Sequence, residues 1–177
     1  GRNRRRYGGL LIHLSIVLMA LGIIGIEMFQ TQTQGSIPQG EILTLGNYDI
    51  RFDFLQTIKS QPTEKLIVRG GKVVGQTITS FPAGENTIAT VEILKDGRRV
   101  GTLEPSRAIY YDSGQTVTTP GLRSTLDDDL YVVLVDWEPI SSDSATFKIY
   151  HNPLINWLWA GGLVFLLGTL VAAWPVK

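Results

Sequence analysis

The sequence predicts a membrane protein in which two transmembrane helices flank an antiparallel all-β domain, a sandwich or small barrel, outside the membrane. Two observations predict this fold class. Residues 7–26 and 151–176 contain no Asp, Glu, Lys or Arg and stand near the two ends of the 177-residue chain. Between these blocks, short runs of alternating apolar and polar residues recur, separated by Gly and Pro.

Each apolar block is long enough to cross a bilayer, since ~20 helical residues at ~1.5 Å each span the ~30 Å hydrocarbon core. We therefore expect five segments in order. They are a cytoplasmic Arg-rich segment at 1–6, a transmembrane helix at 7–29, an extracytoplasmic β domain at 30–152, a second transmembrane helix at 153–174 and a cytoplasmic tail at 175–177.

Two other interpretations fit the apolar blocks less well. The first block could be a cleaved signal peptide, but its ~20-residue apolar run exceeds the usual 7 to 15 and no A-x-A site follows it. Both blocks could be helices buried in a soluble core. The Arg-rich flank and the placement of Trp157 and Trp174 near the ends of the second block are typical of a membrane span instead.

The charges predict the orientation in the membrane. Lys plus Arg and Asp plus Glu number 16 each, yet residues 27–150 hold every acid and carry a net −5. Because excess Lys and Arg mark cytoplasmic flanks, both termini should be cytoplasmic and the acidic domain should face the periplasm of a bacterial inner membrane. The flanking cations are Arg2, Arg4, Arg5, Arg6 and Lys177.

Composition also excludes several classes of site. The chain has no Cys, which rules out disulfides, thiolate zinc sites, iron–sulfur clusters and cysteine nucleophiles. Its balanced charge argues against a broad nucleic-acid surface, so no nucleic-acid partner is expected. It contains no Gly-rich phosphate loop, no H-E-x-x-H and no G-x-S-x-G, so we predict no catalytic residue and no independent hydrolase or NTPase.

The middle segment is strand-like throughout. Residues 48–54 alternate apolar Tyr48, Ile50, Phe52 and Phe54 with charged residues, which is typical of a half-buried strand. Asp96-Gly97 predicts a hairpin turn. Residues 31–40 are expected to be a polar linker. The other predicted strands are 72–78, 90–94, 100–103, 108–111, 130–136 and 145–150.

His13 is the first candidate site residue, because an ionisable ring at membrane depth usually faces protein, a cavity or a cofactor. Gly9 lies four residues earlier on the same helix face. Because glycine has no side chain, this face of the helix would let a flat macrocycle or a neighbouring helix approach closely. The residues alone leave two alternatives: a haem or metal ligand, or a histidine that is hydrogen-bonded within helix packing.

Three other features have simpler interpretations. His151 is expected to be an interfacial polar residue before the second helix, without an assigned role. The acids 127–129 are expected to form a solvated turn, because consecutive residues of an extended segment point in alternating directions and do not match a calcium loop. Gly161, Gly162 and Gly168 predict a face for close helix packing.

Three stretches, residues 3–14, 122–132 and 152–162, together resemble the C-terminal portion of the CcmF family, the membrane subunit of the cytochrome c maturation (System I) haem lyase. The resemblance implies that His13 is an axial ligand of haem b, with the second ligand on an upstream segment or partner chain. Gly9 would then lie against the haem or in helix packing. No metal other than the haem iron is implied.

The resemblance also implies partners. In the family, haem b is thought to supply an electron to haem that the chaperone CcmE delivers, for attachment to the Cys-x-x-Cys-His motif of apocytochrome c presented by the thiol protein CcmH. The chain lacks the family's tryptophan-rich segment, its two periplasmic haem-binding histidines and the partner haem b histidine. We therefore expect a split subunit or the C-terminal part of a longer lyase, not catalytic alone, working with an upstream CcmF-like segment in the lipid bilayer.

An interpretation from another class is a structural or adaptor subunit of a respiratory or photosynthetic complex, with no cofactor of its own. It would explain the acidic exterior and the glycine-rich helices equally well.

Overall fold

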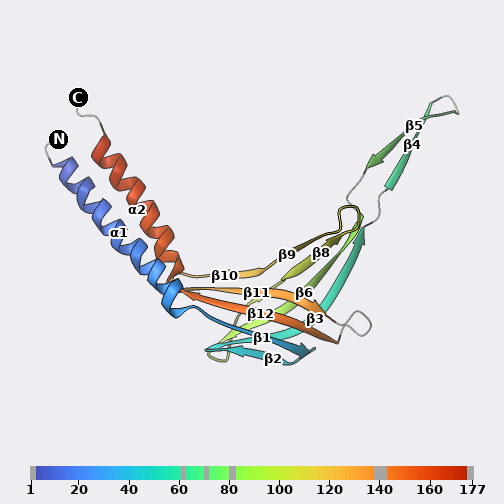
Figure 1. Ribbon diagram of the computed structural model, residues 1–177, viewed down its shortest axis with the longest axis horizontal. Helices are drawn as coiled ribbons and strands as arrows, with labels where there is room; N and C mark the ends of the chain where they lie inside the picture. The colour runs from blue at the N-terminus through green and yellow to red at the C-terminus, as the bar shows by residue number, and fades with distance from the viewer. Residues whose placement is uncertain (1–2, 61–62, 70–71, 80–82, 138–142, 175–177) are drawn as a thin grey trace. The chain divides into compact units, whose positions relative to one another are not determined.

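The computed structural model describes residues 3–60, 63–69, 72–79, 83–137 and 143–174, so the expected tail at 175–177 lies outside the described residues. Two helices, α1 (Arg4–Phe29) and α2 (Ile155–Ala173), are long and apolar enough to cross a membrane. The first begins at Arg4, inside the Arg-rich segment, and the two helices lie side by side (Figure 1). Both flank an antiparallel all-β sandwich, so the predicted fold class is confirmed.

Twelve strands are described between the helices. They are β1 (Thr31–Pro38), β2 (Ile42–Leu45), β3 (Tyr48–Ser60), β4 (Thr63–Arg69), β5 (Lys72–Thr79), β6 (Gly84–Lys95), β7 (Arg98–Leu103), β8 (Ser106–Tyr110), β9 (Gln115–Thr119), β10 (Gly121–Ser124), β11 (Asp128–Trp137) and β12 (Ser144–Pro153). One sheet has the order β1-β12-β11-β10. The second has the order β2-β3-β6-β8-β9, with β7 also paired to β6, and β4 and β5 form a separate hairpin.

The chain divides into two compact units. The first, the helix unit, contains residues 1–33, 122–131 and 149–177, and the second, the β unit, contains residues 34–121 and 132–148. Apolar side chains fill the β unit, and Phe52 of one sheet meets Phe147 of the other with ring centroids 5.4 Å apart. The buried apolar residues of this unit are Ile37, Tyr48, Ile50, Phe52, Ala89, Val91, Ile93, Val132, Leu134, Ala145 and Phe147.

The predicted Asp-Gly hairpin is present between β6 and β7. Lys95 pairs with Arg98 across the turn. The two turn residues, Asp96 and Gly97, have φ angles of 52° and 73°. Positive φ at both central positions is the geometry that matches the twist of the flanking strands.

The polar linker expected at residues 31–40 is instead largely a strand, β1. It lies at the edge of its sheet, beside β12. Only Ile37 of its side chains is buried. An edge strand held by main-chain hydrogen bonds can carry polar side chains on both faces, which is why the sequence pattern missed it.

The alternation in β3 is interrupted after Phe52. Tyr48, Ile50 and Phe52 are buried as predicted, but Phe54 is 47% exposed. The pairing with β6 shifts by one residue between Phe52 and Phe54, which marks a β-bulge. The extra residue moves every later side chain of the strand to the opposite face.

Candidate functional site

Glycines bring the two helices into contact. In α1 the buried residues Gly8, Ser15 and Gly22 follow each other at intervals of seven, and in α2 the buried Gly161 and Gly168 show the same interval. A methyl group placed on Gly161 would lie 2.8 Å from the backbone nitrogen of Met19. The backbones of α1 and α2 therefore lie in close contact at these glycines, without room for a side chain between them.

This contact tests the predicted glycine face of α2. Gly161 and Gly168 both face α1, as predicted. A methyl group on Gly162 would have no atom within 4 Å, so Gly162 does not take part in the contact within the described part of the chain.

His13 lies on the other side of α1. At 100° per residue, a residue two positions before Ser15 is turned by about 200° from the face that meets α2. The His13 side chain is accordingly exposed on the helix pair. Its Nδ1 lies 2.8 Å from the carbonyl oxygen of Gly9. Because a carbonyl only accepts hydrogen bonds, Nδ1 is the donor. Nε2 of the neutral ring then has a lone pair, and no hydrogen-bond partner for it lies in the described part of the chain.

Gly9 gives this face an open surface. A methyl group on Gly9 would have no described atom within 4 Å, so Gly9 does not pack against α2. The neighbouring side chains of this side of α1, Leu10, Ile16 and Val17, are exposed and apolar. An apolar, uncovered surface around one free imidazole nitrogen can receive a flat apolar group or another helix.

A second group of polar side chains lies in the helix unit, where the end of β12 meets the start of α2. It includes two of the three acids that were expected to form a solvated turn. That prediction is wrong for Asp128 and Asp129, which are only 5% and 4% exposed, although Asp127 is exposed. Their carboxylates are buried because neighbouring side chains supply the hydrogen bonds that water would otherwise give.

Asp128 is surrounded by donors. Its Oδ1 accepts a hydrogen bond from Thr125 Oγ1 at 2.9 Å, and the Asp128 backbone nitrogen donates to Thr125 Oγ1 at 3.2 Å. Arg123 Nη1 lies 3.8 Å from Oδ1, and His151 Nε2 lies 3.1 Å from Oδ2. His151 lies in β12, shortly before α2, and contacts a buried acid, which the sequence did not predict; its interfacial position stays a prediction.

Asp129, at the start of β11, links this strand to α2 by hydrogen bonds. Its Oδ1 accepts hydrogen bonds from Ser124 Oγ at 2.6 Å and from Asn156 Nδ2 at 2.8 Å. Asn156 also donates to the carbonyl oxygen of Thr125. Leu154, with φ of 62°, makes the sharp turn into α2, and its backbone nitrogen donates to the carbonyl oxygen of Asp127 at 2.8 Å. We call these seven residues, Arg123, Ser124, Thr125, Asp128, Asp129, His151 and Asn156, the polar joint.

Tyr131 is the titratable neighbour of the polar joint. Its hydroxyl donates to Asp129 Oδ2 at 3.5 Å. Burial raises the pKa of Tyr131 above 10.0, and the charge of Asp129 and its hydrogen bond raise the pKa further. A second negative charge beside Asp129 is disfavoured.

The polar joint suits a structural role better than a chemical one. Among the described residues, no group of three His, Asp or Glu side chains stands close enough to hold a metal ion. Sequence reasoning missed the joint because its hydrogen-bonded members are up to 32 residues apart in the sequence. One local signal was present: Thr125 and Asp128 have the spacing of a side chain that caps a turn.

Comparisons with known proteins agree with this architecture. Residues 79–153 match the family model described as CcmF C-terminal beta-sandwich. The chain is 26% identical over 170 residues to the cytochrome c-type biogenesis protein CcmF of Pseudomonas aeruginosa and 28% identical over 169 residues to that of Haemophilus influenzae. Each alignment covers 96% of this chain and 22% of the relative.

The chain is also similar in sequence to a relative with another name. The chain is 22% identical to the cytochrome c-type biogenesis protein NrfE of Haemophilus influenzae, over 97% of this chain and 24% of the relative. Among solved structures, a chain described as Cytochrome c Heme Lyase CcmF matches with a TM-score of 0.68 at 18% identity, over 98% of this chain and 25% of that chain. The chain thus spans about a fifth to a quarter of the length of these proteins, and it is similar to the C-terminal portion of CcmF.

Proposed function

We propose that this chain acts in cytochrome c maturation as the C-terminal portion of a CcmF-like haem lyase, and that His13 is one axial ligand of a haem b. The observation that carries the ligand assignment is the free Nε2 of His13 on the face of α1 turned away from α2. The relatives named for cytochrome c biogenesis support the process.

The residues around His13 fit a haem. The Gly9 carbonyl fixes the tautomer and the plane of the imidazole, as the hydrogen-bond partner of the other ring nitrogen usually does for ligating histidines. The open space over Gly9 leaves room beside the ring. Leu10, Ile16 and Val17 offer the apolar contacts that a macrocycle needs. When bound, haem b would supply reversible one-electron transfer.

Geometry within the chain places limits on this site. His13 contributes a single ligand, and His151 contacts Asp128, so it is not available as the second. A six-coordinate iron would therefore take its other ligand from outside this chain. A haem between α1 and such a segment would leave the contact between α1 and α2 unchanged, because that contact uses the opposite face of α1.

The remaining partners follow from the same proposal. An inner-membrane protein with two apolar helices would hold its β domain on the periplasmic side, with both termini cytoplasmic. There the domain would work with CcmE, a CcmH-type thiol protein and apocytochrome c. The polar joint would keep the end of β12 and the start of α2 in a fixed geometry.

The test is a visible spectrum of this chain purified together with the rest of the lyase. His13→Ala should abolish the reduced b-type band, because Ala removes the imidazole nitrogen that would bind the iron. The matched control is Leu14→Ala, which removes an exposed side chain at the same membrane depth. An unchanged spectrum in His13→Ala would refute the ligand assignment.

A second readout separates ligation from folding. His13→Gly should recover the b-type band when imidazole is added, because free imidazole can occupy the ligand position. Haem staining of a co-expressed c-type cytochrome tests the maturation role separately. If the band is lost in His13→Ala while covalent haem attachment continues at the normal level, the haem site would stand and its role in maturation would be wrong.

A further inference from the structure

The second half of β3, residues 53–59, is a sheet edge with which no further described strand pairs. β2 pairs with β3 only from Tyr48 to Arg51, and Phe52 bonds with the chain at residues 40 and 41. From residue 53 to residue 59, β3 pairs with β6 on one side and with no described strand on the other. Unpaired N–H and C=O groups in such a row are a template for an added strand.

This edge lacks most of the devices that prevent strand addition. The bulge after Phe52 is one such device, but it lies at the start of the uncovered stretch. Residues 53–59 contain no Pro, and both of their charged side chains are paired within the β unit. Asp53 Oδ1 lies 3.2 Å from Arg51 Nε, and Lys59 Nζ lies 4.0 Å from Glu85 of the neighbouring strand. The remaining residues favour extended backbone.

The face beside this edge is apolar although it points away from the core. Thr57 is exposed but lies on the same face of the sheet as the buried Thr87, with their Oγ1 atoms 2.9 Å apart. Phe54 and Ile58 therefore lie on the opposite face, away from the core. Ile58 is 49% exposed. It begins a row that continues through Asn86 and Ala108 to Val117, which is 46% exposed. An outward row of this kind indicates a contact surface.

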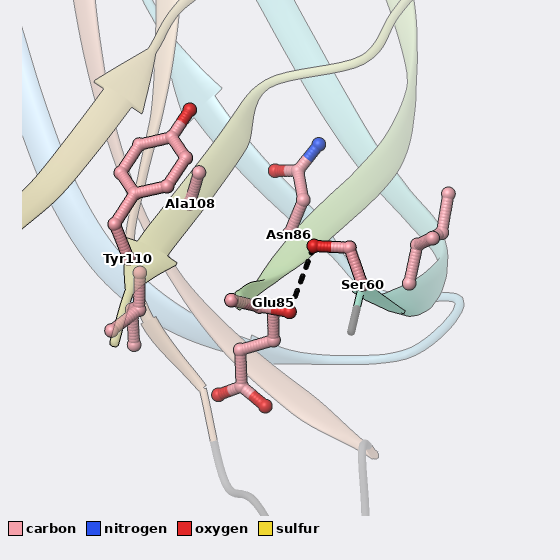
Figure 2. Close-up of a pocket in the computed structure, with 8 residues that line it drawn as sticks. Ser60, Glu85, Asn86, Ala108 and Tyr110 are labelled. Atoms are coloured by element: carbon pink, nitrogen blue, oxygen red, sulfur yellow. Dashed lines mark hydrogen bonds between the residues drawn. The ribbon is translucent and has the colours of Figure 1, made fainter. Parts of the chain in front are cut away.

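A hollow of about 260 Å³ lies in this face (Figure 2). Asn86 and Tyr110 point to one side of the sheet, together with Ala108, and Glu85 points to the other. The Oδ1 atom of Asn86 is buried and has no hydrogen-bond partner in the described part of the chain. A buried acceptor without a donor is unfavourable, so we expect a partner to supply the donor.

The size and charge of the site indicate its occupant. The hollow is smaller than the roughly 300–1,000 Å³ of small-molecule sites, so it suits one side chain of a larger partner. The β unit, residues 34–121 and 132–148, has 12 acids and 10 cations, a net −2, which favours cationic segments over anionic ones. A Lys or Arg side chain has donors and no acceptor, as Asn86 Oδ1 requires.

We propose that the β3 edge, residues 53–59, binds an extended cationic polypeptide segment by strand addition. The segment's main chain pairs with β3, its apolar side chains lie beside Phe54 and Ile58, and one Lys or Arg donates to Asn86 Oδ1. This recognition uses the main chain for affinity and side chains for selection. It rests on the β unit alone and is independent of the haem assignment.

The test uses the full chain in lipid nanodiscs and a fluorescein-labelled ten-residue peptide of alternating Val and Thr with two central Lys. Fluorescence anisotropy should report binding. Ile58→Lys should weaken binding roughly tenfold. The new Lys would repel the two Lys of the peptide, and the apolar contact of Ile58 would be lost. The matched control is Val117→Lys, an equally exposed change in the same row at the far strand. It should change the affinity less than about twofold.

Two further comparisons separate main-chain pairing from general attraction. Methylation of alternate backbone nitrogens in the peptide should weaken binding at least roughly tenfold, since it removes the main-chain donors. Asn86→Ala should weaken the Lys peptide about tenfold but leave a norleucine version unchanged. Hydrogen exchange at residues 54–58 should slow when the parent peptide is added.

Several outcomes would overturn the proposal. They are the absence of binding by the parent peptide, equal binding of the methylated peptide, or equal losses in Ile58→Lys and Val117→Lys. Dimerisation of the chain that Ile58→Lys abolishes, without peptide binding, would assign this edge to a second copy instead. Thermal unfolding of both Lys variants checks that they fold as the parent does.

Discussion

The helix unit and the β unit differ in how each is packed internally. Where α1 meets α2, the contact residues are glycines such as Gly22 and Gly161, which bring backbones together. Where the two sheets of the β unit meet, large side chains such as Phe52 and Phe147 fill the space. In lipid, burying another apolar side chain gains little over lipid contact, whereas in water it gives the main driving force.

Polar groups sharpen the contrast. In the helix unit, the polar joint places two carboxylates out of water and satisfies them with hydroxyl, amide and imidazole groups. In the β unit, the largely buried carboxylate of Glu92 pairs with Arg51 and Arg99, whose side chains are exposed to water. The helix unit should therefore be sensitive to added atoms and to lost hydrogen bonds, and the β unit to lost volume.

The largest effect is expected in the β unit. Phe147→Ala should lower the free energy of unfolding by about 3–5 kcal/mol, because a fully buried ring leaves a cavity. Urea unfolding of the full chain in detergent micelles measures the change. Phe54→Ala removes an equal ring from a half-exposed position and should cost less than about 1 kcal/mol. Equal losses in both variants would contradict the assignment of the core.

The next effect concerns the polar joint. Asp128→Ala should cost about 2–3 kcal/mol, since the donors of Thr125 and His151 would lose a buried acceptor. Asp127→Ala is the control, because the Asp127 side chain is exposed and Leu154 bonds only to its backbone oxygen. The same unfolding experiment measures both. A cost of Asp128→Ala within the range of the control would show that the joint contributes nothing to stability.

A smaller effect is expected where the helices meet. Gly161→Leu should cost about 1–3 kcal/mol by forcing α1 and α2 apart. Gly162→Leu adds the same side chain one residue later, where no described atom lies within 4 Å, and should be close to neutral. Loss of helix contact on titration with dodecyl sulfate can be followed by tryptophan fluorescence. If the two variants behaved alike, the glycine contact would not be what holds this pair.

The smallest effect depends on pH. The folded state raises the pKa of Tyr131 above 10.0, so it holds that proton more tightly than the unfolded chain does. The resulting stability is fully present below pH 10 and is lost as the pH rises through the raised pKa. Tyr131→Phe should remove this part of the alkaline decline, measured as unfolding midpoints between pH 9 and 11. A decline of unchanged steepness in Tyr131→Phe would place its cause elsewhere.

Much of the fold could be predicted from local pattern. The alternation of Tyr48, Ile50 and Phe52 and the Asp96-Gly97 turn are properties of a few neighbouring residues, and both appear as predicted. The strand at residues 31–38 could not be predicted, because its partner β12 lies more than 100 residues away. Phe54 was assigned to the wrong face because a single bulge changes the phase of a strand.

For the candidate site too, some features could be predicted from the sequence and others depend on folding. The position of His13 in an apolar helix, with Gly9 one turn before it, is visible in the sequence. The face on which His13 lies is decided by which glycines meet α2, and Gly9 is not one of them. Burial of Asp128 and Asp129 likewise depends on Asn156 and His151, which the chain brings to them only after folding.

The sequence by itself determined that two apolar helices enclose an alternating, acidic β segment, because length, charge and periodicity act over a few residues. Only the tertiary structure decided which polar groups are satisfied. It left His13 Nε2 and Asn86 Oδ1 without a described partner, while it gave His151 and both buried acids theirs. Hydrogen bonds between distant residues and the close approach of helices require particular atoms to meet, and no local pattern specifies that meeting.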